Sequence, residues 1–404
     1  MRKAIIFILC LMSGNVLCAG TDARILLDSG VHEPIIQGEF EVLCLRSKGR
    51  PSLHPVACQA VDPANLKAKA VFKSSQFRIV LSGADQLSLK LMSGRSFFKL
   101  RGRAFRFRGK FRWQGQTIKQ LDVVLQPKGT HWVLHLPLER YLEGVLGAEV
   151  PGSWPIEALK AQAVASRSYF LWKQDLKGRY YDVRSDHMDQ VFSLRKKVSP
   201  NIRTAVRATR GVFLRSNLSQ KVFPAFFHSD CGGGTSTEHS VWRRPASENQ
   251  PVVDRFCRTA PQNRWTHTLA SAQILSVLKK IFLLPRGVKL MGVMPSGRKG
   301  DRAFFIDFLL GDHLVKSLSA NEFRKQFGFG KIKSTRFQVV KSNSEFKFTG
   351  QGYGHGVGMC QWGAKRWASK GRLFPEILRH YYPTAELRIL RKSPYSVASR
   401  ARRP

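Results

Sequence analysis

The sequence predicts an α+β protein, with a β-rich N-terminal domain over residues 20–130 and a mixed helix and sheet core over residues 131–386. Two observations favour this class. Short apolar runs of β type fill the first region, and two segments with helical character follow directly after it. With 404 residues and 43% hydrophobic content, the chain is long enough for two or three packed domains.

The N-terminal region is expected to form strands because aromatic, leucine and β-branched residues gather in short runs, at residues 40–43, 77–81, 87–91 and 105–113. In the last run aromatic and basic residues alternate, so one face of the strand is cationic and the other can pack. The cationic face could lie against an anionic polymer. We favour the simpler interpretation, a half-buried strand whose basic face is solvated.

The core opens with a predicted helix that carries a carboxylate on its apolar stripe. Helical period puts Leu138, Leu142, Val145 and Glu149 on one face. The helix should end at residue 149, because the residue before Pro151 is pushed out of helical geometry. A carboxyl that is half removed from water holds its proton to higher pH, as a general acid must.

A second, buried helix is predicted for the Ala-rich residues 156–170. Pro155 and Glu157 are helix-start signals at its first turn. A short Pro/Gly turn would join the two helices and present Glu149 at their junction.

Charge and the N-terminus limit the partners. The chain has 67 Lys and Arg against 27 Asp and Glu, a net charge of +40, which implies a polyanion such as nucleic acid, anionic lipid or an acidic cell-wall polymer. Residues 1–19 have the basic start, apolar stretch and small residues of a secretory signal peptide. We therefore expect an exported protein of the periplasm or cell envelope, without a nucleic-acid partner.

No later segment offers about 18 uninterrupted apolar residues, so the exported chain is expected to be soluble or peripherally bound. The tail over residues 387–404 is basic. It could be an arm that contacts an anionic wall or membrane surface, or simply a solvated tail.

Five cysteines remain beyond such a signal. Proximity in sequence suggests Cys44 with Cys58 and Cys231 with Cys257, leaving Cys360 unpaired, although spacing does not fix connectivity. Five reduced, mostly buried thiols are the alternative.

Short motifs follow one another along the core. They are Glu149-Val150-Pro151, Arg167-Ser168-Tyr169, Asp189-Gln190-Val191-Phe192, His228-Ser229-Asp230-Cys231-Gly232-Gly233, Asn321-Glu322-Phe323-Arg324, and Gly352-Tyr353-Gly354-His355-Gly356-Val357-Gly358 with Cys360-Gln361-Trp362-Gly363. In this order, over roughly residues 95–385, they resemble the SpoIID/LytB family, which contains cell-wall lytic transglycosylases first associated with sporulation. The chain departs from the family at Cys360, where serine is more usual.

The resemblance implies cleavage of peptidoglycan glycan strands between N-acetylmuramic acid and N-acetylglucosamine, on strands trimmed of stem peptides, leaving 1,6-anhydro-muramyl ends. Glu149 matches the glutamate that acts as acid and base. A hydrolytic pair would need a second carboxylate about 5–9.5 Å away, for which Glu143 and Asp189 are candidates. The alternatives are a muramidase that uses water and a non-enzymatic wall-binding protein that activates an amidase or another wall hydrolase.

Further substrate-binding positions are suggested by the motifs, each with a structural alternative: Gln162, Arg167, Tyr169, Gln190, His228, Ser229, Cys231, His355 and Gln361. The alternating glycines of residues 352–358 superficially suggest a phosphate loop, but no lysine follows at the required spacing. Close backbone approach to a glycan, with His355 projecting into the cleft, and simple turn formation both remain open.

No cofactor is expected. His228, Cys231 and His239 are suitable zinc ligands by type, but their spacing matches no standard finger and a fourth ligand is not evident. If an ion were bound there, its role would be structural rather than catalytic.

Overall fold

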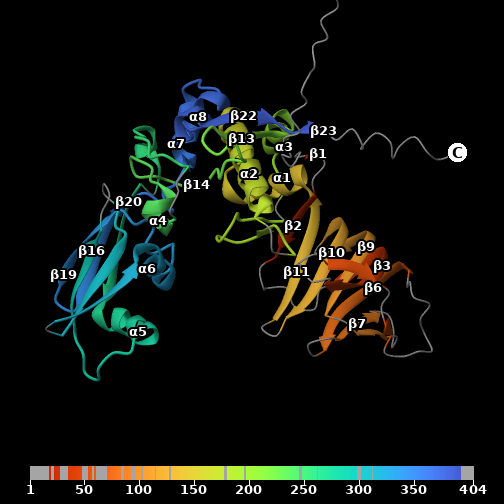
Figure 1. Ribbon diagram of the computed structural model, residues 1–404, viewed down its shortest axis with the longest axis horizontal. Coiled ribbons are helices and arrows are strands. Elements are labelled where there is room, and N and C mark those ends of the chain that lie inside the picture. Colours follow the sequence, from red (N-terminus) through yellow and green to blue (C-terminus); the bar gives the residue numbers. More distant parts are fainter. Residues whose placement is uncertain are drawn as a thin grey trace, which may run out of the picture.

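The computed structural model (Figure 1) describes most of the chain. The described residues are 18–19, 22–27, 35–47, 53–56, 59–60, 71–82, 86–91, 97–101, 103–113, 115–126, 129–176, 180–194, 197–244, 248–261, 263–297, 302–311 and 313–392. The predicted signal peptide, apart from Cys18 and Ala19, lies outside them, as do Cys58 and the tail beyond residue 392.

The fold is α+β, as predicted, and its N-terminal part is an 11-stranded sheet with the order β12-β2-β11-β10-β9-β3-β6-β7-β8-β5, in which β4 also pairs with β3. Its strands are β2 (Asp22–Leu26), β3 (Ile35–Ser47), β4 (Leu53–Val56), β5 (Gln59–Ala60), β6 (Val71–Ser82), β7 (Gln86–Leu91), β8 (Phe97–Arg101), β9 (Ala104–Trp113), β10 (Gln116–Gln126), β11 (Gly129–Pro137) and β12 (Val183–Arg184). The pairs are antiparallel except β12 with β2.

Strand β9 bears out the half-buried strand with a solvated basic face. Its aromatic residues Phe105, Phe107, Phe111 and Trp113 are buried in the main core, whereas Arg108 and two other basic residues of the opposite face are exposed. In a pleated strand alternate side chains point to opposite faces, so the alternating aromatic and basic residues form one buried face and one solvent-exposed face.

The helices lie between this sheet and a C-terminal lobe (Figure 1). They are α1 (Leu138–Glu149), α2 (Ile156–Asp175), α3 (Pro200–Ala208), α4 (Glu238–Trp242), α7 (Gln361–Ser369) and α8 (Phe374–Tyr381). Two small sheets accompany them, β13 (Val212–Ser216) with β22 (Ala385–Ile389), and β14 (Phe227–His228) with β21 (Met359–Cys360). A further short pair joins β1 (Cys18–Ala19) to β23 (Arg391–Lys392).

The C-terminal lobe has its own hydrophobic core. It contains the sheet of β15 (Arg264–Ala270), β20 (Glu345–Gln351) and β19 (Phe337–Ser342), the sheet of β16 (Leu290–Ser296), β17 (Phe305–Leu310) and β18 (Leu314–Ser319), and the helices α5 (Ser271–Ile281) and α6 (Ala320–Phe327). None of the helices in the described part of the chain has the length and apolarity that crossing a bilayer requires.

Two expected boundaries shift. Strand β11 continues the N-terminal sheet to Pro137, and Leu136 shares one core with Leu142 of α1 and Phe170 of α2. The sheet and the first helices therefore pack as one body rather than meeting at residue 130. At the other end, β22 pairs with β13 through Ile389, so the ordered core extends past residue 386.

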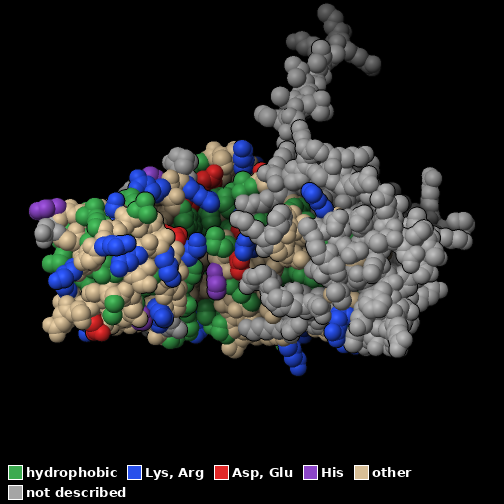
Figure 2. Space-filling model, turned by 90° about the horizontal axis from the view of Figure 1, so that it is seen from below, with side chains coloured by type: hydrophobic (Ala, Val, Ile, Leu, Met, Phe, Trp, Pro, Cys, Tyr) green, Lys and Arg blue, Asp and Glu red, His purple; other side chains and the backbone are tan. Residues whose placement is uncertain are grey.

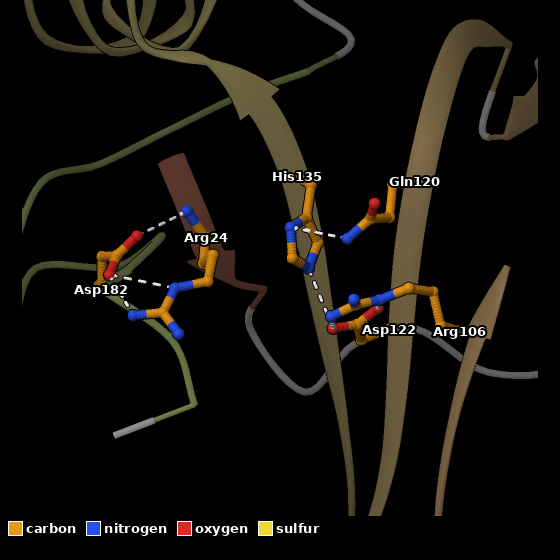
Figure 3. A network of polar contacts seen from close by, with 6 residues as sticks. All are labelled: Arg24, Arg106, Gln120, Asp122, His135 and Asp182. Carbon is orange, nitrogen blue, oxygen red and sulfur yellow. Dashed lines mark hydrogen bonds and ion pairs between the residues drawn. The ribbon is translucent and has the colours of Figure 1, made fainter. Parts of the chain in front are cut away.

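Two ion-pair networks stabilise the sheet where it meets the helices (Figure 3). Asp122 is 2% exposed, and Arg106 binds both of its oxygens at 2.7 and 2.8 Å while His135 Nε2 lies 2.9 Å from Oδ2. Burial alone would raise the pKa of Asp122, but these contacts hold it below its ordinary value. Next to this network, Arg24 of β2 binds Asp182 at 2.6 Å and so attaches the segment that leads into β12.

Replacing Arg106 should destabilise the protein, because it leaves the buried Asp122 carboxylate without its main partner. We expect Arg106→Leu to lower the unfolding free energy by about 3 kcal/mol at pH 7, measured by urea denaturation. Arg108→Leu, on the exposed face of the same strand, should change it by less than about 0.5 kcal/mol.

The loss of unfolding free energy in Arg106→Leu should become smaller as the pH falls. Because folding lowers the pKa of Asp122, its stabilisation is complete above its unfolded pKa of about 4 and disappears as the pH falls through the folded pKa. The gap between wild type and Arg106→Leu should therefore narrow in acid. A gap that is constant with pH, or equal effects of the two leucine variants, would contradict this account.

Candidate functional site

Glu149 is the last residue of α1, as predicted. Leu142 and Val145 are completely buried on the stripe that precedes it, and α1 ends because Val150, before Pro151, is extended at φ −136° and ψ 148°. A turn of six residues, 150–155, then leads to Ile156, where α2 begins. The carboxyl therefore lies at the corner between two packed helices.

The Glu149 carboxyl is held by two segments from elsewhere in the chain. Its Oε1 accepts the backbone N–H of Val191 at 3.0 Å, and its Oε2 accepts Nε2 of Gln361 in a long contact of 3.5 Å. Burial raises the pKa of Glu149 above its ordinary value, although these hydrogen bonds and the nearby His187 oppose the shift. The predicted direction of the pKa shift is confirmed.

The Val191 N–H reaches Glu149 because the preceding and following residues are fixed. Gln190 is 1% exposed; its Oε1 accepts the Tyr141 hydroxyl at 2.9 Å and its Nε2 donates to the Ser166 carbonyl at 3.3 Å. The Phe192 ring lies against Gly144 of α1, where a Cβ would come within 2.4 Å of it. Gln190 therefore positions the backbone beside Glu149, and both polar ends of its amide are already used.

Arg167 and Tyr169, predicted as substrate-binding, instead support the packing of α2. Arg167 is 0% exposed, and its guanidinium binds Glu139 at 2.6 Å and donates to the Val212 carbonyl at 2.9 Å. The Tyr169 hydroxyl donates to Asp189 at 2.9 Å. The sequence left a structural role open for both residues, and their contacts favour that role.

Gln162 differs from these two residues. It is 2% exposed and donates Nε2 to the Ser166 hydroxyl at 3.2 Å within its own helix. Its Oε1 is buried and has no hydrogen-bond partner among the described residues. A buried acceptor without a partner costs free energy, so this amide is the member of the predicted set on α2 that keeps unused binding capacity.

Neither candidate for a second carboxylate contacts Glu149. Asp189 already binds Lys173 at 2.7 Å, the Tyr169 hydroxyl and the backbone N–H of Arg184. Glu143 lines a cavity of about 360 Å³ together with basic residues of α1 and the 193–203 segment, and Glu149 is not among its lining residues. No carboxylate of the described residues is hydrogen-bonded to Glu149, and Asp189 is engaged by partners of its own.

The two motifs that contain His228 and His355 are brought together by short backbone pairings. Strands β14 and β21 pair in parallel, and a bridge joins Asp230 to Tyr353. The rings of His228 and His355 are 5.4 Å apart between centroids. Burial lowers the pKa of both rings, for His355 to about 3, so both are neutral at neutral pH.

Both histidines also hold the backbone of the glycine-rich loop. His228 Nδ1 lies 3.1 Å from the Val357 carbonyl, and His355 Nδ1 accepts the Val357 N–H at 3.0 Å. The Nε2 atom of His228 is buried without a partner among the described residues.

The alternating glycines of this loop are required by its conformation. Gly352, Gly354, Gly356 and Gly358 have φ values of 81°, 115°, 85° and 69°, which L side chains rarely adopt. A Cβ on Gly358 would lie 2.1 Å from the Phe226 carbonyl oxygen. Of the two interpretations that the sequence left open, turn formation accounts for these residues.

The cysteines of the core are free, buried thiols rather than a disulfide pair. Cys231 and Cys257 have their sulfur atoms 3.3 Å apart, and Cys360 lies beside them.

Ser229, another predicted substrate-binding residue, uses its backbone carbonyl to accept the Trp362 N–H at 3.1 Å. The predicted zinc set is not assembled, because His228 and His239 are outside the cluster of ligand-type residues that the described structure contains.

Three positions that the sequence did not assign to the site belong to it in the structure. Val191 acts through its backbone N–H, which leaves no side-chain signal. Asp230 and Cys257 join Cys231 and Cys360 in one cluster. The available signal was that both large motifs of the core carry a cysteine.

Substituting Gly358 should disturb this loop. We expect Gly358→Ala to lower the unfolding free energy by about 2–4 kcal/mol, because the strain of a positive φ adds to a backbone clash. Gly371 is the matched control: its φ is 81° but nothing lies within 4 Å of an added Cβ, so Gly371→Ala should cost only about 1 kcal/mol. Equal losses in thermal or urea unfolding would show that the close contact with Phe226 does not matter.

Comparison with known proteins finds one family match and several relatives. Residues 126–215, which include α1, α2 and the Gln190-Val191 segment, match the family model SpoIID, described as stage II sporulation protein. The chain is 30% identical over 252 residues to an uncharacterized protein of Brachyspira hyodysenteriae, covering 62% of this chain and 66% of the relative. It is 29% identical over 292 residues to the amidase enhancer of Bacillus subtilis, covering 61% of this chain and 40% of the relative.

A third relative is the stage II sporulation protein D of Bacillus subtilis, 27% identical over 273 residues, which cover 63% of this chain and 75% of the relative. The chain thus spans less than two thirds of the length of the first two relatives. The chain therefore contains a SpoIID region over residues 126–215, and about three fifths of its length is similar to the two Bacillus subtilis relatives.

Proposed function

We propose that the protein is a peptidoglycan lytic transglycosylase that cleaves the bond between N-acetylmuramic acid and N-acetylglucosamine, on glycan strands trimmed of stem peptides. The observation that carries the proposal is the environment of Glu149. It is a partly buried carboxyl with a raised pKa, held by the Val191 N–H at 3.0 Å and by Gln361. The SpoIID match over residues 126–215, together with relatives named for sporulation and for amidase enhancement, supports a role at the cell wall.

The chemistry needs one group that can give and then take a proton. Protonated Glu149 donates its proton to the glycosidic oxygen as the bond from C1 to that oxygen breaks. The resulting carboxylate then removes the proton of the muramyl 6-hydroxyl, whose oxygen bonds to C1 and closes the 1,6-anhydro ring. Both sugar fragments are released and Glu149 ends protonated, so no water is consumed.

Burial of Glu149 favours its protonated form, whereas its two hydrogen bonds favour the carboxylate, so each serves a different step of the cycle. Burial keeps Glu149 protonated at higher pH and prepares it as an acid. Donors at Val191 and Gln361 stabilise the carboxylate once the proton has left. A group with both influences can change its protonation state within one cycle, as a general acid that becomes a general base must.

Positive charge supports an anionic, extended substrate or surface. The chain carries a net charge of +40, and Figure 2 shows basic side chains spread over the visible described surface, with few acidic ones. A surface of this kind attracts polyanions by long-range electrostatics. Anionic cell-wall material is the partner that fits this charge best, because the N-terminal sequence predicts export to the cell envelope.

A second candidate is a non-enzymatic wall-binding protein that activates an amidase. It is favoured by the relative named amidase enhancer, of which the chain covers 40%. The two functions differ in what they require of Glu149. A binding protein gains nothing from a carboxyl whose pKa is raised by burial, whereas a general acid depends on it.

Removing the Glu149 carboxyl should abolish cleavage without unfolding the protein. We expect Glu149→Gln to lower the rate of strand cleavage by about 10²–10⁴-fold, because general acid and base catalysis is lost. The assay is mass analysis of the ends released from purified denuded and intact glycan strands. Glu143→Gln, on the same helix but in a separate cavity, is the control that should keep its activity.

The products separate the candidates. Anhydro-muramyl ends that depend on Glu149 support the proposal, and reducing ends would point to a muramidase. If wild type and variant both bind glycan and neither releases ends, the enzymatic proposal is wrong. The amidase candidate then predicts that both proteins stimulate an added amidase equally.

The pH profile of cleavage should depend on Gln361. Its amide donates to Glu149 and so lowers the pKa of that carboxyl. Removing the donor in Gln361→Leu should raise the pKa further and move the alkaline limb of the rate profile to higher pH. Gln338→Leu, an exposed change in the C-terminal lobe, should leave the limb in place. A limb that moves to lower pH would contradict the assigned role of the amide.

A further inference from the structure

Four buried groups of metal-ligand type converge beside the glycine-rich loop. The ligand atoms of Asp230, Cys231, Cys257 and Cys360 all lie within 4.8 Å of one another. They come from three segments of the chain: Asp230 and Cys231 follow β14, Cys257 lies in the short 3-10 helix Phe256–Thr259, and Cys360 ends β21. We propose that these four residues bind a single zinc ion in a structural site.

The spacing suits one ion. Tetrahedral zinc with Zn–S bonds of about 2.3 Å places pairs of sulfur ligands about 3.8 Å apart. The sulfur atoms of Cys231 and Cys257 are 3.3 Å apart, and the whole set stays within 4.8 Å. A disulfide would need about 2.05 Å, and an iron–sulfur cluster would spread its cysteines around several metal atoms rather than one point. Three thiolates and one carboxylate form a closed set of four, typical of a structural site.

Two backbone N–H groups point at the Cys360 sulfur. The Cys360 sulfur accepts the backbone N–H groups of Cys231 and Gly363, both at 3.3 Å. Cys360 is also the N-cap of α7, a nine-residue helix whose dipole favours negative charge at this end. These donors would hold the Cys360 sulfur as the charged ligand that zinc requires.

Outer contacts orient the carboxylate. Asn263 donates Nδ2 to both oxygens of Asp230, at 3.3 and 3.1 Å, and the Gly232 N–H donates to Oδ1 at 2.9 Å. Hydrogen bonds of this kind commonly fix the carboxylates that bind metals. Asp230 is thereby held with its thiol neighbours while its remaining lone pairs stay available.

A buried guanidinium beside the cluster gives an independent reason for negative charge there. Arg302 is 5% exposed and donates Nη2 to the Cys231 carbonyl at 2.7 Å, whereas its Nη1 has no partner among the described residues. A buried cation needs compensation. Zinc with three thiolates and one carboxylate has a net charge of +2 − 4 = −2, which supplies it. With neutral thiols, the negative groups at the cluster would be the carboxyl of Asp230 and that of the buried Asp254, whose Oδ2 lies 3.5 Å from the Cys231 sulfur.

The ion would connect this cluster to the proposed active site. Cys360 directly precedes Gln361, the residue that reaches Glu149, and the Trp362 N–H binds the Ser229 carbonyl at 3.1 Å. Zinc at this point would fix the start of α7 against the 228–231 segment and so set the position of Gln361. The metal site itself does not depend on the proposed catalytic function.

Metal content tests the site directly. The full chain is purified without chelators, reduced and dialysed, and its metals are measured by mass spectrometry. We expect about one zinc per chain, and uptake of cobalt by the zinc-free protein should give the visible absorption of a tetrahedral thiolate complex. Cys257→Ser and Cys360→Ser should lose the zinc, whereas Cys44→Ser, on β3 of the N-terminal sheet, should retain it.

A milder variant covers the case in which the serine variants do not fold. Asn263→Leu removes only the outer contact to Asp230 and should weaken zinc retention against a competing chelator about 10–100-fold. The proposal is wrong if reduced wild-type protein neither contains zinc nor takes up zinc or cobalt. It is equally wrong if the Cys257 and Cys360 variants bind as much zinc as wild type. Neither readout uses glycan cleavage, so its outcome is separate from that of the proposed function.

Discussion

The hydrogen bond from the Val191 N–H to Glu149 stabilises the carboxylate at the centre of the candidate site, and its geometry is set by segments from the N-terminal sheet and the first two helices. A carboxyl at the end of a buried helix loses hydration, which raises its pKa, and one fixed N–H limits that penalty. The N–H is held in place by Gln190 and by Phe192 against Gly144. Farther back, Asp182 and β12 attach the same segment to the N-terminal sheet. The sheet thus supports the backbone group that binds Glu149.

The opposite side of Glu149 is built from the C-terminal half of the chain. The parallel pair β14 and β21 places the start of α7 beside the 228–231 segment, and Gln361 then extends to the carboxyl. The glycine-rich loop permits this pairing because Gly358 has no side chain. A Cβ at this position would lie only 2.1 Å from the Phe226 carbonyl oxygen. In the same place three thiols and a carboxylate come together. A zinc ion there would make the geometry around Gln361 less dependent on the marginal stability of short strands.

Elements with a strong local period could be predicted from the sequence. The helices α1 and α2 and strand β9 lie where their apolar patterns indicated, because each pattern has to be buried on one face. Their long-range partners could not be predicted. The ion pair between Arg167 and Glu139, and the meeting of Cys257 with Cys360, depend on how segments pack after folding. Local periodicity carries no information about that packing, so the sequence leaves Arg167 between a substrate-binding and a structural role and does not predict that Cys360 joins Cys231 and Cys257.

The central claim is that Glu149 activates the substrate's own hydroxyl rather than water. The most direct measurement is digestion of denuded glycan strands in ¹⁸O-labelled water, with mass analysis of the muramyl product. The account predicts an anhydro product without ¹⁸O, formed by wild type and absent with Glu149→Gln. Incorporation of ¹⁸O at the muramyl end in a Glu149-dependent reaction would show that water is the acceptor and would contradict the account.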